Sequence, residues 1–321
     1  MGTAAVLVAS GCSSSQPAGS TSASGSSGKA GKRHKVAFIP GCTCDPYYSA
    51  ETAGFQAAAK SAGVDAIVQG PANFTASEQI PVLQAVVQKR PDAIVIDPTD
   101  AKALAAPIEA AIAQGIPVMT TGNNVNTDKI FTAIAASSVK GGQLGAEELM
   151  RQKPKGGEVV FVHIKPGISS IDDREAGFKK AFKGKSKYKV LSNLYAGNDS
   201  ATQAAGLVSA TLSAHPNLTA IFASNVITAQ GAANAVKTAG KTGKIAVVGY
   251  DAGPQEVADL QAGTLTALVS QNPSQIGHLA IENAVKYLNG DKNIPKDQPL
   301  DPLVITKATL NDPKSQTALY K

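Results

Sequence analysis

Short apolar runs alternate along this chain with longer stretches in which apolar residues recur at helical spacing. The first run, 36–39, is continuous, as expected of a parallel strand covered on both faces. Pro40 and Gly41 end it, and after a polar loop a helical pattern containing Phe55 begins. Further strands are predicted at 66–68, 93–96, 116–119, 130–134, 159–162, 189–191, 220–223, 245–248 and 265–269. Amphipathic helices are predicted at 77–89, 101–114, 141–152, 202–214, 228–239 and 274–288.

This alternation of strands and helices predicts the α/β class, with parallel sheets covered by helices on both faces. The length of 321 residues exceeds the usual size of one domain and indicates about two. The strands outnumber what one small sheet needs. The pattern therefore favours two doubly wound halves.

Composition and charge add little to this picture. The chain has a net charge of +6, and a basic excess can indicate nucleic-acid binding. No helix–turn–helix, zinc-finger or aromatic RNA-binding motif accompanies it, so no nucleic-acid partner is expected. We interpret the lysines as solvated helix faces. For the basic run at 179–189, docking on an acidic partner or an anionic membrane is the alternative.

The N-terminus indicates export. Residues 4–9 are apolar, and small residues precede Cys12, as at the cleavage site of bacterial lipoproteins, where the cysteine carries the lipid. The match departs at Ala9, where leucine is usual, and no Lys or Arg precedes the apolar run. Residues 13–31 have the composition of a flexible tether. We expect residues 1–34 to be a signal remnant and tether, Cys12 to be a lipid anchor, and the protein to be an extracytoplasmic membrane lipoprotein at the cell surface or in the periplasm. An ordinary flexible N-terminus with a chance cysteine is the alternative.

The chain lacks the sequence motifs of several enzyme classes. Neither G-x-G-x-x-G, nor the phosphate-binding G-x-x-x-x-G-K-[ST], nor G-x-S-x-G is present, and the four histidines are scattered. Cys42 and Cys44 have no histidine near them in sequence, so a metal site is not expected. A ligand-lining or packing role for these cysteines is favoured, and a disulfide stays open. We expect no enzyme, no cofactor and no metal.

The loop after the first strand carries the first candidate chemistry. It places Asp45, Pro46, Tyr47 and Tyr48 together in a chain with only 5% aromatic residues. Such loops lie at the carboxyl ends of parallel strands, where ligands bind. A carboxylate beside two rings suits a ligand with an apolar face and a hydroxyl edge. Ordinary packing of both tyrosines is the alternative.

Seven motifs in order resemble one family, the ribose-binding-protein-like branch of type I periplasmic sugar-binding proteins, which are receptors of ABC importers. The resemblance covers 35–313, nearly the whole globular part. The motifs are the loop 45–48 together with PDAIVI at 91–96, GIPV at 115–118, REAGF at 174–178, HPNLTAIF at 215–222, VGYD at 248–251 and QNP at 271–273.

The resemblance implies two doubly wound parallel-sheet lobes joined by a three-crossing hinge. The first lobe would comprise 35–136 plus 272–300, and the second 137–271 plus 301–321. A small polar ligand, a sugar or polyol, would bind between them by hinge closure. An ABC permease would be the partner of a monomer. A sensory receptor serving a membrane kinase or chemoreceptor, and an enzyme on the same scaffold, are the alternatives.

The resemblance also implies a set of ligand-binding residues. The first lobe would offer Asp45, Tyr47, Tyr48, Asp97 and Asn123. The second would offer Asp172 and Arg174 on a loop into a helix, Asn198, Asn225 and Asp251 after strands, and Gln271 at the crossover. A helix-start ion pair is the alternative for Arg174, and a helix N-cap for Asp251.

The sequence departs from the family at two positions in this set. Gly122 and Asn123 stand where an aspartate and a second polar residue are usual, and Asp172 stands where an arginine is frequent. The loss of that carboxylate removes a strong acceptor for sugar hydroxyls. The ligand is therefore expected to be a different sugar, a polyol or another small polar molecule.

Overall fold

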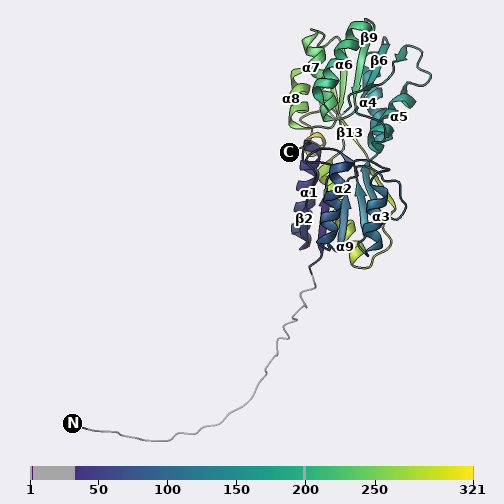
Figure 1. Ribbon diagram of the computed structural model, residues 1–321. Coiled ribbons are helices and arrows are strands. Elements are labelled where there is room, and N and C mark those ends of the chain that lie inside the picture. The colour runs from purple at the N-terminus through teal and green to yellow at the C-terminus, as the bar shows by residue number, and fades with distance from the viewer. Residues whose placement is uncertain (1, 3–32, 198–199, 321) are drawn as a thin grey trace. The chain divides into compact units, whose positions relative to one another are not determined.

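Two β-sheets, built mostly from parallel strands, organise the computed structural model, which describes residues 2, 33–197 and 200–320. By its contacts the chain divides into two units, 1–32 and 33–321, and the second is described here. The first sheet has the order β12-β5-β4-β3-β1-β2, and the second the order β13-β11-β10-β9-β6-β7, with β8 paired to β6. Figure 1 shows each sheet with its helices as a separate lobe.

The first sheet consists of β1 (Lys35–Ile39), β2 (Asp65–Val68), β3 (Ala93–Ile96), β4 (Val118–Thr121), β5 (Ala133–Ala136) and β12 (Asp297–Leu300). The second consists of β6 (Gly157–His163), β7 (Tyr188–Val190), β8 (Leu194–Tyr195), β9 (Leu218–Ala223), β10 (Ala246–Tyr250), β11 (Ala267–Ser270) and β13 (Leu303–Thr306). The helices are α1 (Pro46–Ala62), α2 (Ala76–Gln88), α3 (Ala105–Ala113), α4 (Ser138–Gln152), α5 (Ser169–Phe182), α6 (Ala201–Ala214), α7 (Val226–Thr238), α8 (Pro254–Ala262), α9 (Pro273–Leu288) and α10 (Pro313–Thr317).

The chain passes from one sheet to the other three times, after β5, after β11 and after β12. β12 returns to the first sheet and pairs in parallel with β5, whereas β13 pairs antiparallel with β11 in the second. The predicted fold class is therefore confirmed. The residues at which we placed the lobe boundaries stay a prediction about which parts move together.

Continuous apolar strands and glycine contacts build the core of the first lobe. Residues 36–39 of β1 are buried between β2 and β3. Helices α1 and α9 approach so closely that a Cβ at Gly54 would lie 2.0 Å from the backbone oxygen of Ser274. Only glycine permits such a separation. This packing fixes the middle of α1, whose first turn carries Tyr47 and Tyr48, against the start of α9.

Several elements differ from the sequence prediction. We did not predict the short strands β8, β12 and β13, because their pattern is brief and partly polar. The expected loop around Asp172 and Arg174 is wrong, because α5 begins earlier, at Ser169. Its buried positions Ile171, Arg174 and Phe178 follow helical spacing, but the arginine among them hides the pattern.

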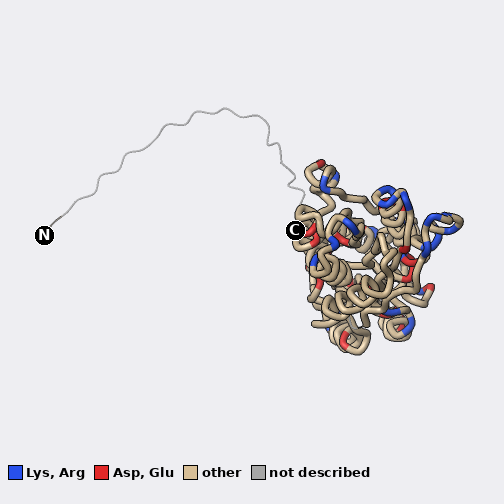
Figure 2. Tube along the Cα trace, turned by 90° about the horizontal axis from the view of Figure 1, so that it is seen from above, with Lys and Arg blue, Asp and Glu red and all other residues tan. Residues whose placement is uncertain are grey.

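The charged side chains of the described residues are spread over the surface and partly paired. Figure 2 shows Lys and Arg at several separate places around the globular part, with acidic residues among them. In the basic run, Lys189 pairs with Glu158 at 2.8 Å, and Lys179 pairs with Glu175. Among the described helices, none has the length and hydrophobicity that crossing a bilayer requires.

Candidate functional site

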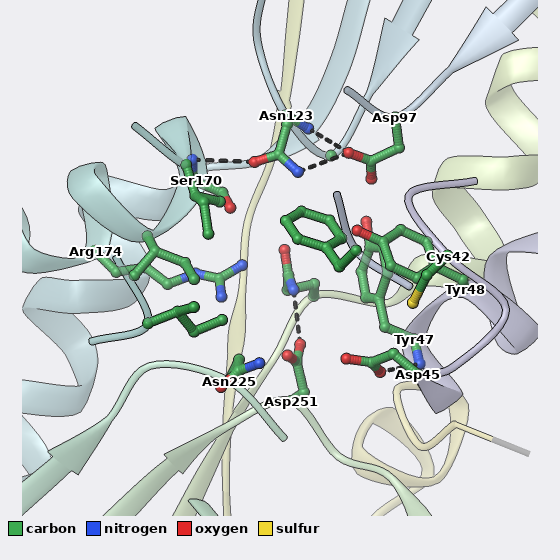
Figure 3. Close-up of a pocket in the computed structure, with 16 residues that line it drawn as sticks. Cys42, Asp45, Tyr47, Tyr48, Asp97, Asn123, Ser170, Arg174, Asn225 and Asp251 are labelled. Carbon is green, nitrogen blue, oxygen red and sulfur yellow. Dashed lines mark hydrogen bonds between the residues drawn. The ribbon is translucent and has the colours of Figure 1, made fainter. Parts of the chain in front are cut away.

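A cavity with about 500 Å³ of empty space lies where loops of the two lobes meet. Figure 3 shows polar side chains of both lobes converging on it. Nine of the eleven residues that we predicted line this cavity: Asp45, Tyr47, Tyr48, Asp97, Asn123, Arg174, Asn225, Asp251 and Gln271. Cys42, for which a ligand-lining or packing role was favoured, lines it as well, whereas the predicted set did not include the other lining residues, Phe74, Gly122, Ile164, Ile168, Ser170 and Ile171.

The first wall begins with a loop that is fixed at two points. Cys42 and Cys44 form a disulfide, which the sequence left open, and Cys42 lines the cavity. Asp45 is the N-cap of α1, and its Oδ1 accepts a hydrogen bond of 2.8 Å from the Tyr47 amide. With Pro46 in the first turn, this cap sets the direction in which the helix starts.

Three aromatic rings continue the first wall. Tyr47 and Tyr48 meet edge to face with centroids 5.0 Å apart, and Tyr48 stacks on Phe74 at 6.2 Å. Gly41 leaves room for this arrangement, since a Cβ there would lie 2.4 Å from the Tyr48 hydroxyl oxygen. Phe74 lies in a polar segment before α2, and no periodic signal singles it out in the sequence. Ring faces of this kind suit the C–H surface of a sugar.

Asp97, directly after β3, supplies a carboxylate to this wall. Its Oδ1 accepts hydrogen bonds from the Asn123 side-chain nitrogen (2.7 Å) and the Asn123 backbone nitrogen (3.1 Å). Its Oδ2 is buried and has no hydrogen-bond partner. Burial raises the pKa of Asp97 to about 7, although the Asn123 donors act against this. An orphaned acceptor in a cavity wall indicates a place for a ligand donor.

Gly122 explains how this carboxylate fits. A Cβ at position 122 would lie 1.9 Å from Asp97 Oδ2, and the backbone there has φ 61°. The Asp97 carboxylate, which follows the neighbouring strand β3, thus occupies the space that a side chain at position 122 would take. The departure seen in the sequence at Gly122 does not leave the wall without an acceptor.

A second acid lies behind this wall. Glu51 on α1 is fully buried, and neither of its carboxylate oxygens has a hydrogen-bond partner. Burial, and next to it the charge of Asp97, raise the pKa of Glu51. The hydroxyl of Tyr47, one turn earlier on the same helix, is also buried without a partner. Polar oxygens without a partner therefore lie both in this wall, at Tyr47 and Asp97, and behind it, at Glu51.

Arg174 on α5 supplies a cation to the opposite wall. Its guanidinium lies 3.7 Å from the centroid of the Tyr250 ring, and its Nη1 donates to the Ser224 carbonyl at 2.7 Å. A ring face and a backbone oxygen hold it, rather than a carboxylate at the helix start. Its Nε is buried without a partner. The planar group can therefore present donors to a ligand.

Asn225 and Asp251 follow β9 and β10 at the carboxyl edge of the second sheet. Asn225 is the N-cap of α7, and its Oδ1 accepts from the Thr228 amide at 3.0 Å in a capping box. Asp251 is not an N-cap, because Gly253 caps α8. Its φ of 79° is unusual for a non-glycine residue, and such strain concentrates at functional sites.

Polar contacts hold Asp251 in this conformation. Gln271 Nε2 donates to Asp251 Oδ1 at 2.6 Å, and the Tyr320 hydroxyl donates to the same oxygen at 2.6 Å. Burial raises the pKa of Asp251, while Arg174 and these two donors act in the other direction.

The remaining two predicted residues do not join this cavity. Asp172 lies outside its lining: its Oδ1 is 3.0 Å from His163 Nε2, and its Oδ2 accepts from the Gly167 amide. Asp172 therefore fixes the loop before α5, which carries Ile164 and Ile168 into the wall. Asn198 falls outside the described residues.

Direct contacts join the two walls across the cavity. The Ser170 amide donates to Asn123 Oδ1 at 3.2 Å, and the Asn124 amide donates to Ser169 Oγ at 2.8 Å. Among the described residues, no group of three or more His, Cys, Asp or Glu side chains is arranged to hold a metal ion. The lining thus combines carboxylate oxygens that can accept from hydroxyl groups, guanidinium and amide donors, and aromatic ring faces. An uncharged polar ligand needs this combination.

Comparisons with known proteins find sequence similarity to periplasmic binding proteins. Residues 36–292 match the family model described as periplasmic binding protein domain. The ribose import binding protein of Bacillus subtilis is 32% identical over 248 residues, which are 77% of this chain and 79% of that protein.

Two solved structures are similar over most of the chain. An ABC transporter solute-binding protein from Agrobacterium vitis, bound with α-D-tagatopyranose, has a TM-score of 0.87 and 33% identity, and the match covers 90% of this chain and all of that one. A carbohydrate transporter solute-binding protein from Agrobacterium radiobacter, in complex with D-arabinose, has a TM-score of 0.85 and 28% identity, with 90% and 99% coverage.

Proposed function

This chain belongs to the periplasmic binding protein family, and from that premise we propose that it is the extracytoplasmic solute-binding protein of an ABC importer for a small sugar or polyol. The observation that carries the proposal is the cavity lined by acceptors, donors and rings of both lobes. The orphaned Asp97 oxygen and the Arg174 Nε give a ligand a partner on each wall.

We propose a monosaccharide as the ligand, in its ring form. Tyr47, Tyr48 and Phe74 present rings for its C–H face, and the carboxylates accept from its hydroxyls. Similar proteins are named for ribose and allose, or were solved with tagatopyranose and D-arabinose. The acceptor supplied from β3 beside Gly122 favours a hydroxyl pattern different from that of ribose.

Binding couples to lobe closure. A ligand that touches both walls stabilises the closed arrangement by its differential contacts, because an open arrangement offers only one wall at a time. Closure also removes water, which strengthens each polar contact. The closed pair of lobes would present the surface that an ABC permease reads. A lipid on Cys12, which lies outside the described residues, would keep the receptor at the membrane.

A thermal-shift panel tests the proposal. The purified protein is melted alone and with D-ribose, D-allose, D-arabinose, D-tagatose, D-fucose and D-mannitol. Because the ligand binds the folded form, it stabilises by about 2.7 kcal/mol at 100 times the dissociation constant, a shift of several degrees. No shift with any sugar or polyol would overturn the proposal.

Two substitutions connect binding to the cavity. We expect Tyr47→Ala and Asn225→Ala to weaken the sugar that gives the largest shift, without unfolding the protein. Tyr195→Ala is the control, because Tyr195 is the most exposed large apolar side chain described and does not line the cavity. Wild-type affinity in both cavity variants would place the site elsewhere.

A further inference from the structure

The C-terminal tail ends at the back of the ligand cavity. After β13, the chain forms α10 and then buries Ala318 and Tyr320, each 4% exposed. The Ser270 hydroxyl donates to the Ala318 carbonyl at 2.5 Å, and the Tyr320 amide donates to the Ala252 carbonyl at 3.0 Å. The tail is thus attached to the last residue of β11 and to the segment that follows β10, next to Gln271 and Asp251.

Tyr320 reaches two walls from this position. Its hydroxyl donates to Asp251 Oδ1 at 2.6 Å, and its ring meets the Tyr47 ring edge-on with centroids 6.0 Å apart. Asp251 belongs to the second lobe, whereas Tyr47 belongs to α1 of the first. One side chain near the end of the chain therefore contacts a binding residue of each lobe.

We propose that Tyr320 is a positioning residue for ligand binding: it fixes the Asp251 carboxylate toward the ligand and completes the closed arrangement through Tyr47. This proposal deepens the proposed function and rests on it. Tyr320 itself does not line the ligand cavity. It acts through Asp251 from behind.

The geometry at Asp251 supports this role. Asp251 lines the cavity, and Gln271 and Tyr320 both donate to its Oδ1, so contacts within the protein fix the carboxylate through that one oxygen. Asp251 holds a backbone conformation that non-glycine residues rarely adopt, so its orientation depends on such contacts. Hydrogen bonds to an ionised carboxylate are among the stronger ones in proteins.

Burial, and then the charge of Asp251, raise the pKa of Tyr320 well above its usual value. The Tyr320 hydroxyl therefore keeps its proton at neutral pH and can donate to Asp251. Among the described residues, the other charged or titratable groups that interact with Asp251 are Arg174 of α5, Glu256 of α8 and Tyr250 of β10. Arg174 favours its ionised form, and Glu256 opposes it.

The ring of Tyr320 also forms part of a partition. A second cavity is lined by Thr43, Cys44, Asp45, Pro46, Ser49, Pro254 and Tyr320. Asp45 lines both cavities. Tyr320 lines the second cavity, and its hydroxyl donates to Asp251 in the wall of the ligand cavity. Removal of the Tyr320 ring is therefore expected to join the two cavities and to let water reach Asp251.

The test compares three tyrosine variants, using the panel sugar that gives the largest shift with the wild type. We expect Tyr320→Phe to raise the dissociation constant about tenfold, mostly through a faster dissociation rate, because the aligned acceptor is lost after docking. Tyr320→Ala should weaken binding further. Tyr188→Phe is the matched control: its hydroxyl bonds to the Lys153 carbonyl, away from the cavity, and its affinity should equal the wild type.

A pH profile separates this role from a merely structural one. Loss of the Tyr320 donor removes a bond to the ionised form, so the pKa of Asp251 rises further in Tyr320→Phe. Affinity should then fall on acidification at a higher pH than in the wild type. Equal affinity and an unchanged profile in Tyr320→Phe would overturn the inference while leaving sugar binding intact. A wild type that binds no sugar would overturn both proposals.

Discussion

Two aspartates that each follow a strand, one in each lobe, are held in different ways. Asp97 follows β3 of the first sheet and Asp251 follows β10 of the second, and both are buried in the cavity wall. Asp251 is fixed by side chains from two distant segments, Gln271 and Tyr320. Among the described residues, the Asp97 carboxylate accepts hydrogen bonds from Asn123 alone and keeps one oxygen without a partner.

These two arrangements have different consequences for ligand binding. A carboxylate that is aligned in advance costs little to use when the ligand arrives, whereas an orphaned buried carboxylate costs stability until a ligand satisfies it. The second lobe is therefore expected to determine affinity. The first is expected to link affinity to protonation and protein stability.

The largest expected effect is at the aligned carboxylate. Asp251→Asn replaces an acceptor of two donors by an amide and removes the charge opposite Arg174. We expect a loss of about 3 kcal/mol in binding, or about 100-fold in the dissociation constant, by titration calorimetry. Asp259→Asn is the control, since Asp259 also accepts from two side chains but lies outside the cavity. A loss below threefold at Asp251 would end the comparison.

Gly122→Ala tests the space that Asp97 needs. The new methyl would collide with Asp97 Oδ2, so the carboxylate must turn away. We expect roughly 30-fold weaker binding, and about 1–2 kcal/mol lower stability from the positive φ.

Gly63→Ala isolates the backbone term. Gly63 has φ 67° but nothing near its missing Cβ, so this variant should lose similar stability and keep full affinity. If Gly122→Ala binds as well as Gly63→Ala, the collision with Asp97 has no role in binding.

Asp97→Asn should have a smaller effect on binding, about tenfold, and an opposite effect on stability. Unfolded aspartate ionises near pH 4, whereas burial raises the pKa of Asp97 to about 7 in the fold. The raised pKa means that the wild type loses stability as the pH rises between these values. The variant lacks this loss and should melt a few degrees higher at pH 8, with a flatter profile.

Glu51→Gln is the companion variant. Burial also raises the pKa of Glu51, but Glu51 does not line the cavity. Like Asp97→Asn, the Glu51→Gln variant should be more stable than the wild type at pH 8. Its affinity for the sugar should stay within threefold of the wild-type affinity. Lower melting temperatures at pH 8 for both variants would contradict the interpretation that Asp97 and Glu51 destabilise the protein when they are buried in ionised form.

The smallest expected effect concerns the loops that support each wall. The first has the Cys42–Cys44 disulfide, and the second has the hydrogen bonds of Asp172. A disulfide that closes so short a loop constrains the unfolded chain little, about 1–2 kcal/mol. The Cys42→Ser/Cys44→Ser double variant should lose about this much in urea unfolding and less than threefold in affinity. A tenfold loss would show that the disulfide orients Tyr47 and Tyr48.

Local pattern and motif were enough for the fold class and much of the candidate site. Continuous apolar strands alternating with amphipathic helices predicted the two doubly wound halves, because burial on both faces of a parallel sheet leaves a direct trace in sequence. Strand-end motifs pointed to Asp97, Asn225 and Asp251, because carboxyl ends of parallel strands converge on one edge.

Which side chains contact one another in the site depends on the folded chain. Phe74 lines the cavity and Tyr320 donates to Asp251, although both residues lie in segments without a periodic pattern. Asp172 contacts His163 and does not line the cavity. The glycine at position 122 indicated a lost carboxylate, whereas packing places the carboxylate of Asp97 beside this position. Such outcomes depend on distances between residues far apart in the chain, which local hydrophobicity and spacing do not encode.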